Sequence, residues 1–498
     1  MNKSNKIAKE ASINIAGEIY GGATRFIFIG LMARFTGPEY LGIYSIGNAI
    51  TRIFGVLGVA GLDRGILRYV SFNNGKKDSN STHKWIKIAL KFGIIFGLIV
   101  TIIQYLLAKF ITTKFYSGNI DIENVISFFS IILLFSIISG IAAHSIQGFK
   151  ILKYKVLTIQ VIQPTILLLV LCLLYNFGVS TFYQITLPLI IAEILGFLFM
   201  IYFLQKVNSI KFISIIKESL NVEILQFSFP LMLVGILGMI MHWIDILMLG
   251  YFLPAKDVGI YQPAVRTTGI IRLFLVSFSG IFAPMISELI AKQSRKEIEQ
   301  VYKLTCRWII TLAVPFYILV ISRSEEIMML FGERYLEGSN LLLLLLSGML
   351  FQAIGNPAGS TLVMAGKTKL VLINTIIISI LNITLNIILI PKIGLIGAAW
   401  GTLISLTILC IIRISQIWII YKIFPFEFKN LKSISSGIIS FVIIYFSYPV
   451  LVNYHFLINL LFSSIIVILS YLGSLYIFKL EHEDLNVIKL IKLKFKRT

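Results

Sequence analysis

The sequence predicts an all-α polytopic membrane protein with about fourteen transmembrane helices. Three observations lead to this fold class: the composition, the length of the apolar stretches and the distribution of positive charge. Of the 498 residues, 57% are hydrophobic and 13% are charged, whereas soluble domains average about 25% charged residues. A chain of this composition is suited to lipid, and its function is expected to take place in or across a membrane.

The apolar stretches have the length that membrane helices require. Because an α-helix rises 1.5 Å per residue, about 20 residues cross the hydrocarbon core of a bilayer. The stretches that meet this length are 11–34, 40–62, 86–108, 124–147, 155–177, 181–205, 225–252, 261–290, 304–323, 339–365, 370–391, 394–421, 433–453 and 455–478.

Positive charge is distributed unevenly between the connecting segments. With the N-terminus inside, the cytoplasmic segments hold about thirty Lys and Arg and the opposite loops about seven, as the positive-inside rule favours. This bias predicts a multi-pass protein of the cell membrane with both termini in the cytoplasm. It also explains the net charge of +21 as a basic inner face beside anionic lipid, and excludes a nucleic-acid partner.

The sequence contains a parallel internal repeat. Gly42-Ile43-Tyr44 recurs as Gly259-Ile260-Tyr261, which is 217 residues further on. The turn at Gln147-Gly148 is matched in the same way by Ala365-Gly366. Each repeat holds an even number of spans, so both enter the membrane from the same side. The predicted organisation is an N-lobe at 1–205, an amphipathic linker at 206–224, a C-lobe at 225–422, and a helix pair with a basic tail at 423–498.

Four arginines lie inside the apolar stretches, at Arg25, Arg52, Arg266 and Arg272. A charge near the bilayer centre costs roughly 2.5–3.5 kcal/mol on insertion scales, so these groups need water, a partner or an anionic ligand. Internal ion pairing is one explanation, and Glu18 lies two helical turns from Arg25. The cations nevertheless outnumber the mid-span carboxylates. Guanidinium groups bind phosphate in a bidentate manner, so we predict that the four arginines bind a phosphate-bearing headgroup.

The repeat relates the arginines of the two halves. Arg52 follows Tyr44 by eight residues, and Arg266 follows Tyr261 by five. Steps of three residues keep side chains on one helical face, so these arginines are expected to share an orientation. Arg25 corresponds to within one residue of His242. Two facing lobes would then line a common cleft with cationic or protonatable groups.

Ion coupling is predicted at Glu18, His242 and Asp245. His242 and Asp245 are three residues apart on one face of a span, and a titratable pair at membrane depth is a candidate for H⁺ or Na⁺ coupling. A structural polar contact to a neighbouring helix is the alternative. No resident cofactor or metal is predicted. Gly366-Lys367-Thr368 lacks the upstream glycine of a phosphate-binding loop, because Thr361 stands there, so no ATP site is expected.

Two segments carry a family resemblance. The run from Gly37 to Ser45, followed by Gly61-Leu62 and Arg68-Tyr69-Val70, resembles the opening of polysaccharide-unit flippases. The run Gly394 to Gly401 resembles the entry of span 12 in the same family. These flippases belong to the multidrug/oligosaccharidyl-lipid/polysaccharide (MOP) exporter superfamily, and the resemblance extends over the whole chain.

The resemblance implies a V-shaped pair of helical bundles with a cationic central cavity and alternating access. It also implies a polyprenyl- or dolichyl-linked oligosaccharide as substrate. Lipid II flippases of this superfamily carry functional arginines in spans 1, 2 and 8, which Arg25, Arg52 and Arg266 match. Arg272 is an additional candidate.

The function predicted from the sequence is a flippase, not an enzyme. It would move a lipid-linked, phosphate-bearing oligosaccharide to the outer leaflet for cell-surface polysaccharide or glycan assembly. Its partners would be this substrate, membrane lipids, and glycosyltransferases or a polymerase of the same pathway. One alternative is a cation-coupled exporter of drugs or small molecules. The other is a membrane glycan polymerase, for which the outer segment Ser324–Glu337 offers four glutamates.

Overall fold

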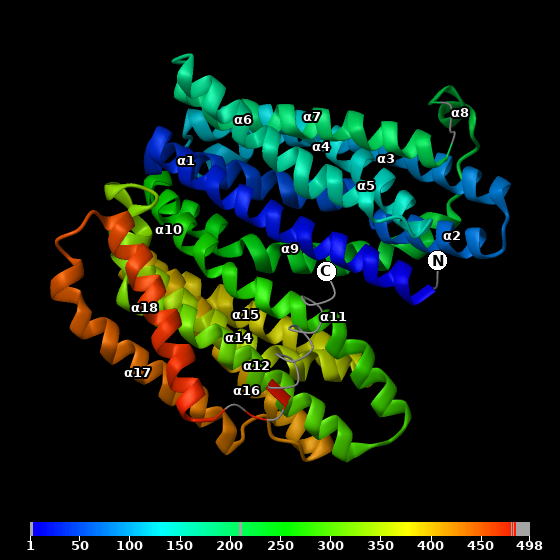
Figure 1. Ribbon diagram of the computed structural model, residues 1–498. Coiled ribbons are helices and arrows are strands. Elements are labelled where there is room, and N and C mark those ends of the chain that lie inside the picture. Colours follow the sequence, from blue (N-terminus) through cyan, green and yellow to red (C-terminus); the bar gives the residue numbers. More distant parts are fainter. Residues whose placement is uncertain (1–2, 209–211, 480, 482, 485–498) are drawn as a thin grey trace. The chain divides into compact units, whose positions relative to one another are not determined.

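The fold is all-helical, as predicted, in the computed structural model, which describes residues 3–208, 212–479, 481 and 483–484. No strand occurs among these residues. The helices, most of them labelled in Figure 1, are α1 Lys3–Val59, α2 Leu62–Gly75, α3 Ser79–Phe115, α4 Ile120–Gly148, α5 Lys153–Val156, the π-helix η1 Leu157–Ile162, α6 Gln163–Asn176, α7 Thr181–Val207, α8 Phe212–Lys217, α9 Glu223–Phe252, α10 Ala255–Thr268, α11 Ile270–Ala291, α12 Arg295–Ser322, α13 Ser324–Met329, the 3₁₀-helix η2 Glu333–Gly338, α14 Ser339–Met364, α15 Thr368–Ile393, α16 Leu395–Tyr421, α17 Phe428–Leu451 and α18 Phe456–Ile477.

Within the described residues, twelve helices are long and apolar enough to cross a membrane. The sequence predicted about fourteen spans. Two features account for the difference. Helix α1 contains two of the predicted stretches, and the predicted stretch 261–290 is divided between α10 and α11. The polytopic helical fold is therefore confirmed, and the count of fourteen stays a prediction.

Helix α1 is divided by a kink at Gly37, which has φ 79° and ψ 175°. Side chains with a Cβ rarely adopt a positive φ, so glycine suits this position. Pro38 follows and has no N–H to donate to the preceding turn. The kink gives α1 two limbs, at 3–36 and 38–59, which carry Arg25 and Arg52 respectively.

The contacts divide the chain into two units. Unit 1 consists of Met1–Pro263 and Asn386–Ala398, and unit 2 of Ala264–Leu385 and Ala399–Thr498. This division differs from the predicted boundary at 206–224, because α9 packs against α1 and α2 and is therefore grouped with unit 1. The lobes inferred from the repeat stay a prediction.

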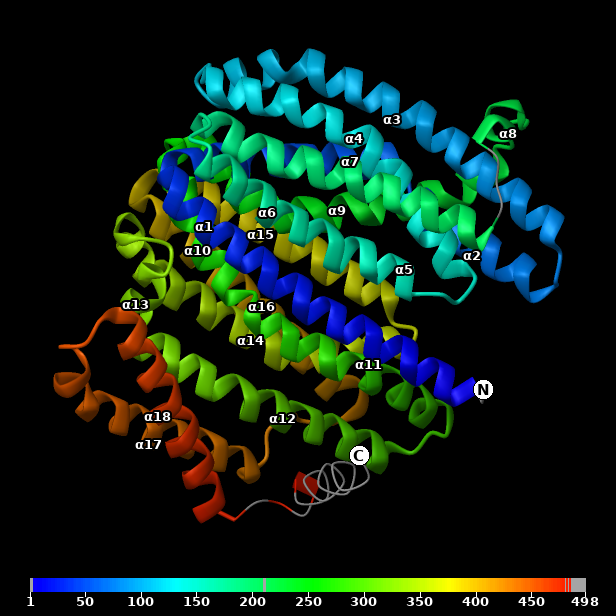
Figure 2. The same cartoon turned by 45° about the horizontal axis from the view of Figure 1, so that its top comes forward.

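Unit 1 has its main core where α2, α3, α4 and α7 meet. Ile66, Ile88, Ile137 and Met200 are all fully buried there, and α3, α4 and α7 run side by side in both views (Figure 2). The opposite face of α3 is apolar and exposed, with Leu106 at 68%. Contiguous exposed apolar surface marks an interaction face, and in a polytopic protein the lipid covers it.

The repeat has a structural counterpart in unit 1. A Cβ at Gly42 would overlap the carbonyl oxygen of Ala255, and a Cβ at Gly259 would overlap the carbonyl oxygen of Pro38. Gly42 corresponds to Gly259 in the repeat, and Pro38 to Ala255 at the same spacing of 217 residues. The contact is therefore reciprocal, as in a two-fold symmetric interface. Glycine is needed on both sides because the backbones touch.

The linker helix α8 is held by two lysines of α3. Lys91 Nζ donates to the carbonyl oxygens of Ile216, at 2.8 Å, and of Glu218, at 2.7 Å. Lys87 forms an ion pair with Glu218 at 3.5 Å. Cations near the C-terminal carbonyls of a helix are favourable. The side chain of Ile216 is 64% exposed, as expected for an amphipathic segment.

In unit 2, the C-terminal helices α17 and α18 pack against each other and against α12. Arg323, at the end of α12, is 3% exposed and donates from Nε to Asn459 Oδ1, at 3.1 Å, and to Ser463 Oγ, at 2.8 Å. Asn459 Nδ2 in turn donates to Glu326 Oε1 at 3.1 Å. The outer segment suggested for a polymerase thus forms α13 and η2, and Glu326 takes part in packing contacts.

Candidate functional site

Arg25, on the first limb of α1, is bonded to the π-helix η1. Its Nη2 donates to Gln160 Oε1 at 2.7 Å and to the carbonyl oxygen of Ile159 at 2.9 Å. Gln160 Nε2 donates to Glu18 Oε1 at 2.7 Å. The predicted Glu18–Arg25 pair is therefore connected through a neutral glutamine. Gln160 orients both charged groups.

The π-helix explains why a backbone carbonyl is available to Arg25. A π-helical turn replaces the i→i+4 bonding of the α-helix with a wider i→i+5 pattern, and such turns occur frequently at functional sites. Short π segments leave carbonyl groups that side chains can reach. The sequence around Leu157–Ile162 is uniformly apolar apart from Thr158 and Gln160, and periodicity gave no sign of this turn.

Arg52, on the second limb of α1, has a carboxylate partner. Its Nη2 lies 3.3 Å from Glu193 Oε1 on α7, and its Nε donates to Asn48 Oδ1 at 3.3 Å. The other oxygen, Glu193 Oε2, accepts from Gln163 Nε2 at 3.0 Å. The Arg52 side chain is 39% exposed and that of Glu193 is 10% exposed. The carboxylate is held in place, whereas one side of the guanidinium is accessible.

The two arginines meet the same helical turn. Gln160, which bonds Arg25, and Gln163, which shares Glu193 with Arg52, are three residues apart, and positions three apart share one face. The kink at Gly37 thus lets residues 27 positions apart in the sequence approach one segment of η1 and α6. The structure brings Glu18, Arg25 and Arg52 into one connected polar group, which we call the arginine–glutamine cluster: Glu18, Arg25, Arg52, Gln160, Gln163 and Glu193.

Two glycines make room for the glutamines of this cluster. A Cβ at Gly21 would lie 2.5 Å from Gln160 Oε1 and 2.7 Å from the Gln160 carbonyl oxygen. A Cβ at Gly196 would lie 2.7 Å from Gln163 Cγ. Small residues allow membrane helices to approach closely. The cluster therefore depends on these glycines as well as on its polar members.

Asp245, on α9, lies in a second polar group of unit 1. Its Oδ1 accepts from Asn386 Nδ2 at 2.7 Å, and its Oδ2 accepts from Tyr261 OH at 3.3 Å. Asn386 and Tyr261 are both fully buried. His242, one turn earlier on α9, is exposed, and its ring contacts Trp243. The structure surrounds the carboxylate with neutral donors from α10 and α15.

Arg266 lies in unit 2, in the last turn of α10, and is half-buried. A cation in the last turn of a helix interacts favourably with the carbonyl end of the helix dipole. The side chain of Arg272, in α11, lies outside the described part of the structure. The common cleft predicted for the arginines of both halves stays a prediction.

Several members of these groups were not singled out from the sequence as site residues. Gln160, Gln163 and Asn386 are mid-span amides, and amide side chains in apolar stretches are a usable signal because they need partners there. Glu193 was noted only as a mid-span carboxylate. Among the described residues, no group of three or more His, Cys, Asp or Glu has the arrangement of a metal site.

The arrangement is suited to an anionic group. Arg52 presents guanidinium N–H groups on its accessible side, and its resident partner is a carboxylate at a long distance. Phosphate oxygens accept bidentate hydrogen bonds from arginine. A phosphate that reached this side chain would meet a preoriented donor, while Gln163 would retain Glu193.

Comparison with known proteins identifies the family. The family described as polysaccharide biosynthesis protein matches residues 7–290, and the family MatE matches residues 230–388. The probable low-salt glycan biosynthesis flippase Agl15 of Haloferax volcanii is 30% identical over 172 residues, which cover 34% of this chain and 36% of that protein. This match spans about a third of that relative's length. Capsular polysaccharide biosynthesis protein CapF of Staphylococcus aureus is 25% identical over 405 residues, covering 80% of this chain and 96% of CapF.

Solved structures share the fold. The inward closed conformation of the lipid II flippase MurJ matches with a TM-score of 0.74 and 20% identity, covering 94% of this chain and 98% of that one. An inward-facing multidrug resistance MATE transporter of the MOP superfamily matches with a TM-score of 0.69 and 16% identity, covering 80% and 94%. At these identities the likeness concerns the fold. Because the first family match covers more than half of the sequence, the chain belongs to the polysaccharide biosynthesis protein family and has the fold of the MOP exporter superfamily, as the resemblance of its motifs predicted.

Proposed function

We propose that the protein is a flippase that moves a lipid-linked, phosphate-bearing oligosaccharide from the cytoplasmic to the outer leaflet by alternating access. The observation that carries this proposal is the arginine–glutamine cluster, in which Arg25 and Arg52 meet one turn of η1 and α6. The names of Agl15 and CapF support a role in glycan or polysaccharide assembly. The protein acts as a transporter in the cell membrane, with both termini in the cytoplasm.

In the proposed cycle, the headgroup phosphate binds the accessible side of Arg52 and replaces Glu193 as its partner. Arg25 and, from unit 2, Arg266 and Arg272 provide further positive charge, and the lipid tail stays in the bilayer. With an inside-negative potential, outward movement of an anionic unit gains about 2.3 kcal/mol per 100 mV. Arginines that moved with the headgroup would cancel part of this gain.

Ion coupling is assigned to Asp245 in this proposal. Its carboxylate oxygens already accept from Asn386 and Tyr261, and oxygen ligands suit Na⁺ or a proton at membrane depth. Glu18 is a second candidate through Gln160, and His242 a third on the exposed side of α9. No ATP or resident cofactor takes part, and the driving force is an ion gradient or the membrane potential.

The test is a flipping assay with full-length protein reconstituted into vesicles that contain a fluorescent lipid-diphosphate oligosaccharide. Hydrogen bonds to charged groups contribute about 1.5–3 kcal/mol, so Arg25→Ala, Arg52→Ala and Arg266→Ala should each slow transport on the order of tenfold to a hundredfold. Arg64, which is exposed on α2, provides the matched control, and Arg64→Ala should transport normally.

The mechanism fails if Arg52→Ala and Arg266→Ala both transport at the normal rate at normal protein levels. The same vesicles separate the competing functions. Export of cationic drugs without headgroup dependence would support a small-molecule exporter, which the MatE match at residues 230–388 makes the second candidate. Formation of longer glycans by the purified protein would indicate a polymerase.

A further inference from the structure

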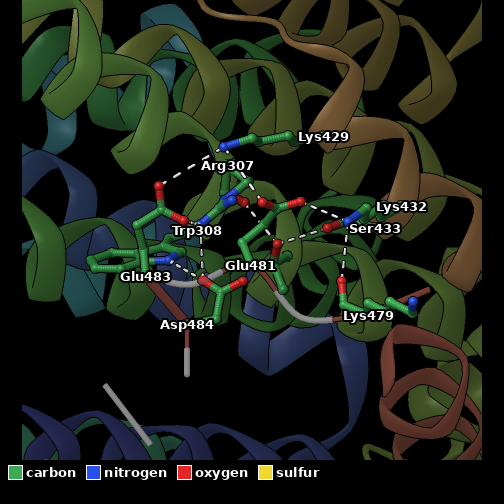
Figure 3. A network of polar contacts seen from close by, with 10 residues as sticks. Arg307, Trp308, Lys429, Lys432, Ser433, Lys479, Glu481, Glu483 and Asp484 are labelled. Carbon is green, nitrogen blue, oxygen red and sulfur yellow. Dashed lines mark hydrogen bonds and ion pairs between the residues drawn. The ribbon is translucent and has the colours of Figure 1, made fainter. Parts of the chain in front are cut away.

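A second cluster of cations lies in unit 2, at the ends of α12 and α17 that the charge bias assigns to the cytoplasm. Four side chains converge there and are shown in Figure 3: Arg307 and Trp308 from α12, and Lys429 and Lys432 from α17. We call these four residues the basic cluster. They take no part in the arginine–glutamine cluster.

The partners of the basic cluster come from a single short stretch after α18. Asp484 Oδ1 accepts from Arg307 Nη2 and from Trp308 Nε1, both at 2.9 Å. Lys432 Nζ donates to Glu481 Oε1 at 2.6 Å. Lys429 Nζ lies 3.5 Å from Glu481 Oε2 and 3.9 Å from Glu483 Oε1, as Figure 3 shows.

The contact therefore divides into a cationic half and an anionic half that are separate in the sequence. All the donors belong to two packed helices, and all the carboxylates, Glu481, Glu483 and Asp484, follow the last helix. Three cations face three carboxylates. A single carboxylate oxygen that accepts from both a guanidinium and an indole N–H occupies the position that a phosphate oxygen would take.

Arg307 has donor capacity that the carboxylates do not use. The residue is 6% exposed, and its buried Nε has no hydrogen-bond partner. A buried guanidinium is costly without a counter-ion, so an anion is required whenever the acidic stretch leaves. Arg, Lys and Trp at a membrane surface are the groups that interact with anionic headgroups.

We propose that the basic cluster is a binding site for a headgroup phosphate at the cytoplasmic membrane surface, and that Glu481, Glu483 and Asp484 occupy it as an intramolecular competitor. The site is distinct from the proposed transport site. The tethered carboxylates compete through their effective concentration, which is in the millimolar range for short linkers. Anionic lipid is locally concentrated at the same surface, so the two ligands exchange.

The test measures lipid retained by the full-length protein. Wild type and the triple variant Glu481→Gln, Glu483→Gln, Asp484→Asn are purified from nanodiscs that contain phosphatidylglycerol, and bound lipid is counted by native mass spectrometry. Loss of the competitor should raise phosphatidylglycerol retention on the order of tenfold. Adding Lys429→Gln and Lys432→Gln to the triple variant should return retention to the wild-type level.

A matched control removes the same charge elsewhere. Glu325, Glu333 and Glu337 are exposed on the outer segment, and their triple replacement by Gln should leave retention unchanged. The proposal is overturned if the two triple variants retain equal amounts of phosphatidylglycerol. It is also overturned if phosphatidylcholine, which carries no net charge, is retained as strongly.

A second measurement identifies the source of the phosphate. Inorganic phosphate added at increasing concentration either displaces the retained lipid, which supports a site that is also supplied from solution, or leaves it bound, which supports a lipid headgroup. Should the triple variant fail to fold, Asp484→Asn alone is compared with wild type by thermal unfolding. A larger stabilisation of this variant by phosphatidylglycerol supports the proposal, and an equal one contradicts it.

Discussion

Equivalent positions of the repeat make the same contact with different chemistry. In the first half, the rings of Phe28 and Tyr44 meet edge to face, with their centroids 6.2 Å apart. In the second half, Asp245 and Tyr261 stand 217 residues further on, and the tyrosine donates a hydrogen bond to the carboxylate at 3.3 Å. The tyrosine is common to both halves, and its partner is apolar in one and anionic in the other.

This difference indicates how a duplicated fold acquires separate roles. The shared tyrosine and the reciprocal glycines, Gly42 and Gly259, maintain the scaffold of both halves. Cations bonded to glutamines lie on the first limb pair, whereas the carboxylate lies on α9. The proposed phosphate site and the proposed ion site therefore arise at different places of one repeated framework.

The largest effect is expected from making the first half resemble the second. Phe28 is 2% exposed, and a carboxylate in its place would have no buried amide like Asn386. Phe28→Asp should destabilise the protein by about 3 kcal/mol or more, the usual cost of a charge at membrane depth. Thermal unfolding in detergent measures this loss. Phe28→Leu is the control, at about 1 kcal/mol, and equal stability of the two variants would contradict the comparison.

The reciprocal glycine contact should give the next largest effect. Gly42→Ala and Gly259→Ala each force a methyl group against a backbone carbonyl, so each should cost about 1–3 kcal/mol. The double variant should cost less than the sum, because one separation of the helices relieves both overlaps. Gly22→Ala is a suitable control, since nothing lies within 4 Å of its Cβ position. Fully additive costs would argue against a shared contact.

A smaller effect is expected when the polar contact of the second half is made apolar. Tyr261→Phe removes one hydrogen bond to Asp245 and should lower stability by about 0.5–1.5 kcal/mol. Asp245→Asn keeps the shape and removes the charge, so under the proposed coupling transport should no longer respond to a Na⁺ or proton gradient. Gradient-driven flipping in vesicles tests this. An unchanged response in Asp245→Asn would remove Asp245 from the coupling site.

The smallest effect concerns pH and lies outside the repeat. The hydrogen bond from Lys432 Nζ, with the nearby Lys429 charge, lowers the pKa of Glu481 below its ordinary value of 4.5. The stabilising contribution is fully present above this ordinary value and is lost as pH falls through the lowered pKa. The difference in thermal stability between wild type and Glu481→Gln should therefore shrink on acidification. For Phe28→Leu, the difference should stay constant, and a parallel decline would refute this assignment.

Part of the site was accessible from the sequence. Arg25 and Arg52 were recognised because a charge inside an apolar stretch is conspicuous, and Glu18 because it lies two turns from Arg25. Gln160 and Gln163 were missed, because neutral amides cost less and give a weaker signal. The π-helix was missed because its bonding pattern does not alter hydrophobic periodicity. The association of Asp245 with Asn386 joins residues 141 positions apart, which no local pattern predicts.

By itself, the sequence determined the membrane fold, the repeat and the family, because hydrophobic length, charge bias and turn motifs are local properties. It also indicated where the costly charges lie. Only the tertiary structure decided which groups satisfy those charges: a glutamine between Glu18 and Arg25, a held carboxylate beside Arg52, and three C-terminal acids on the basic cluster. These partners depend on the kink at Gly37 and on close helix packing, since hydrogen bonds and ion pairs form between atoms a few ångströms apart, whatever their separation along the chain.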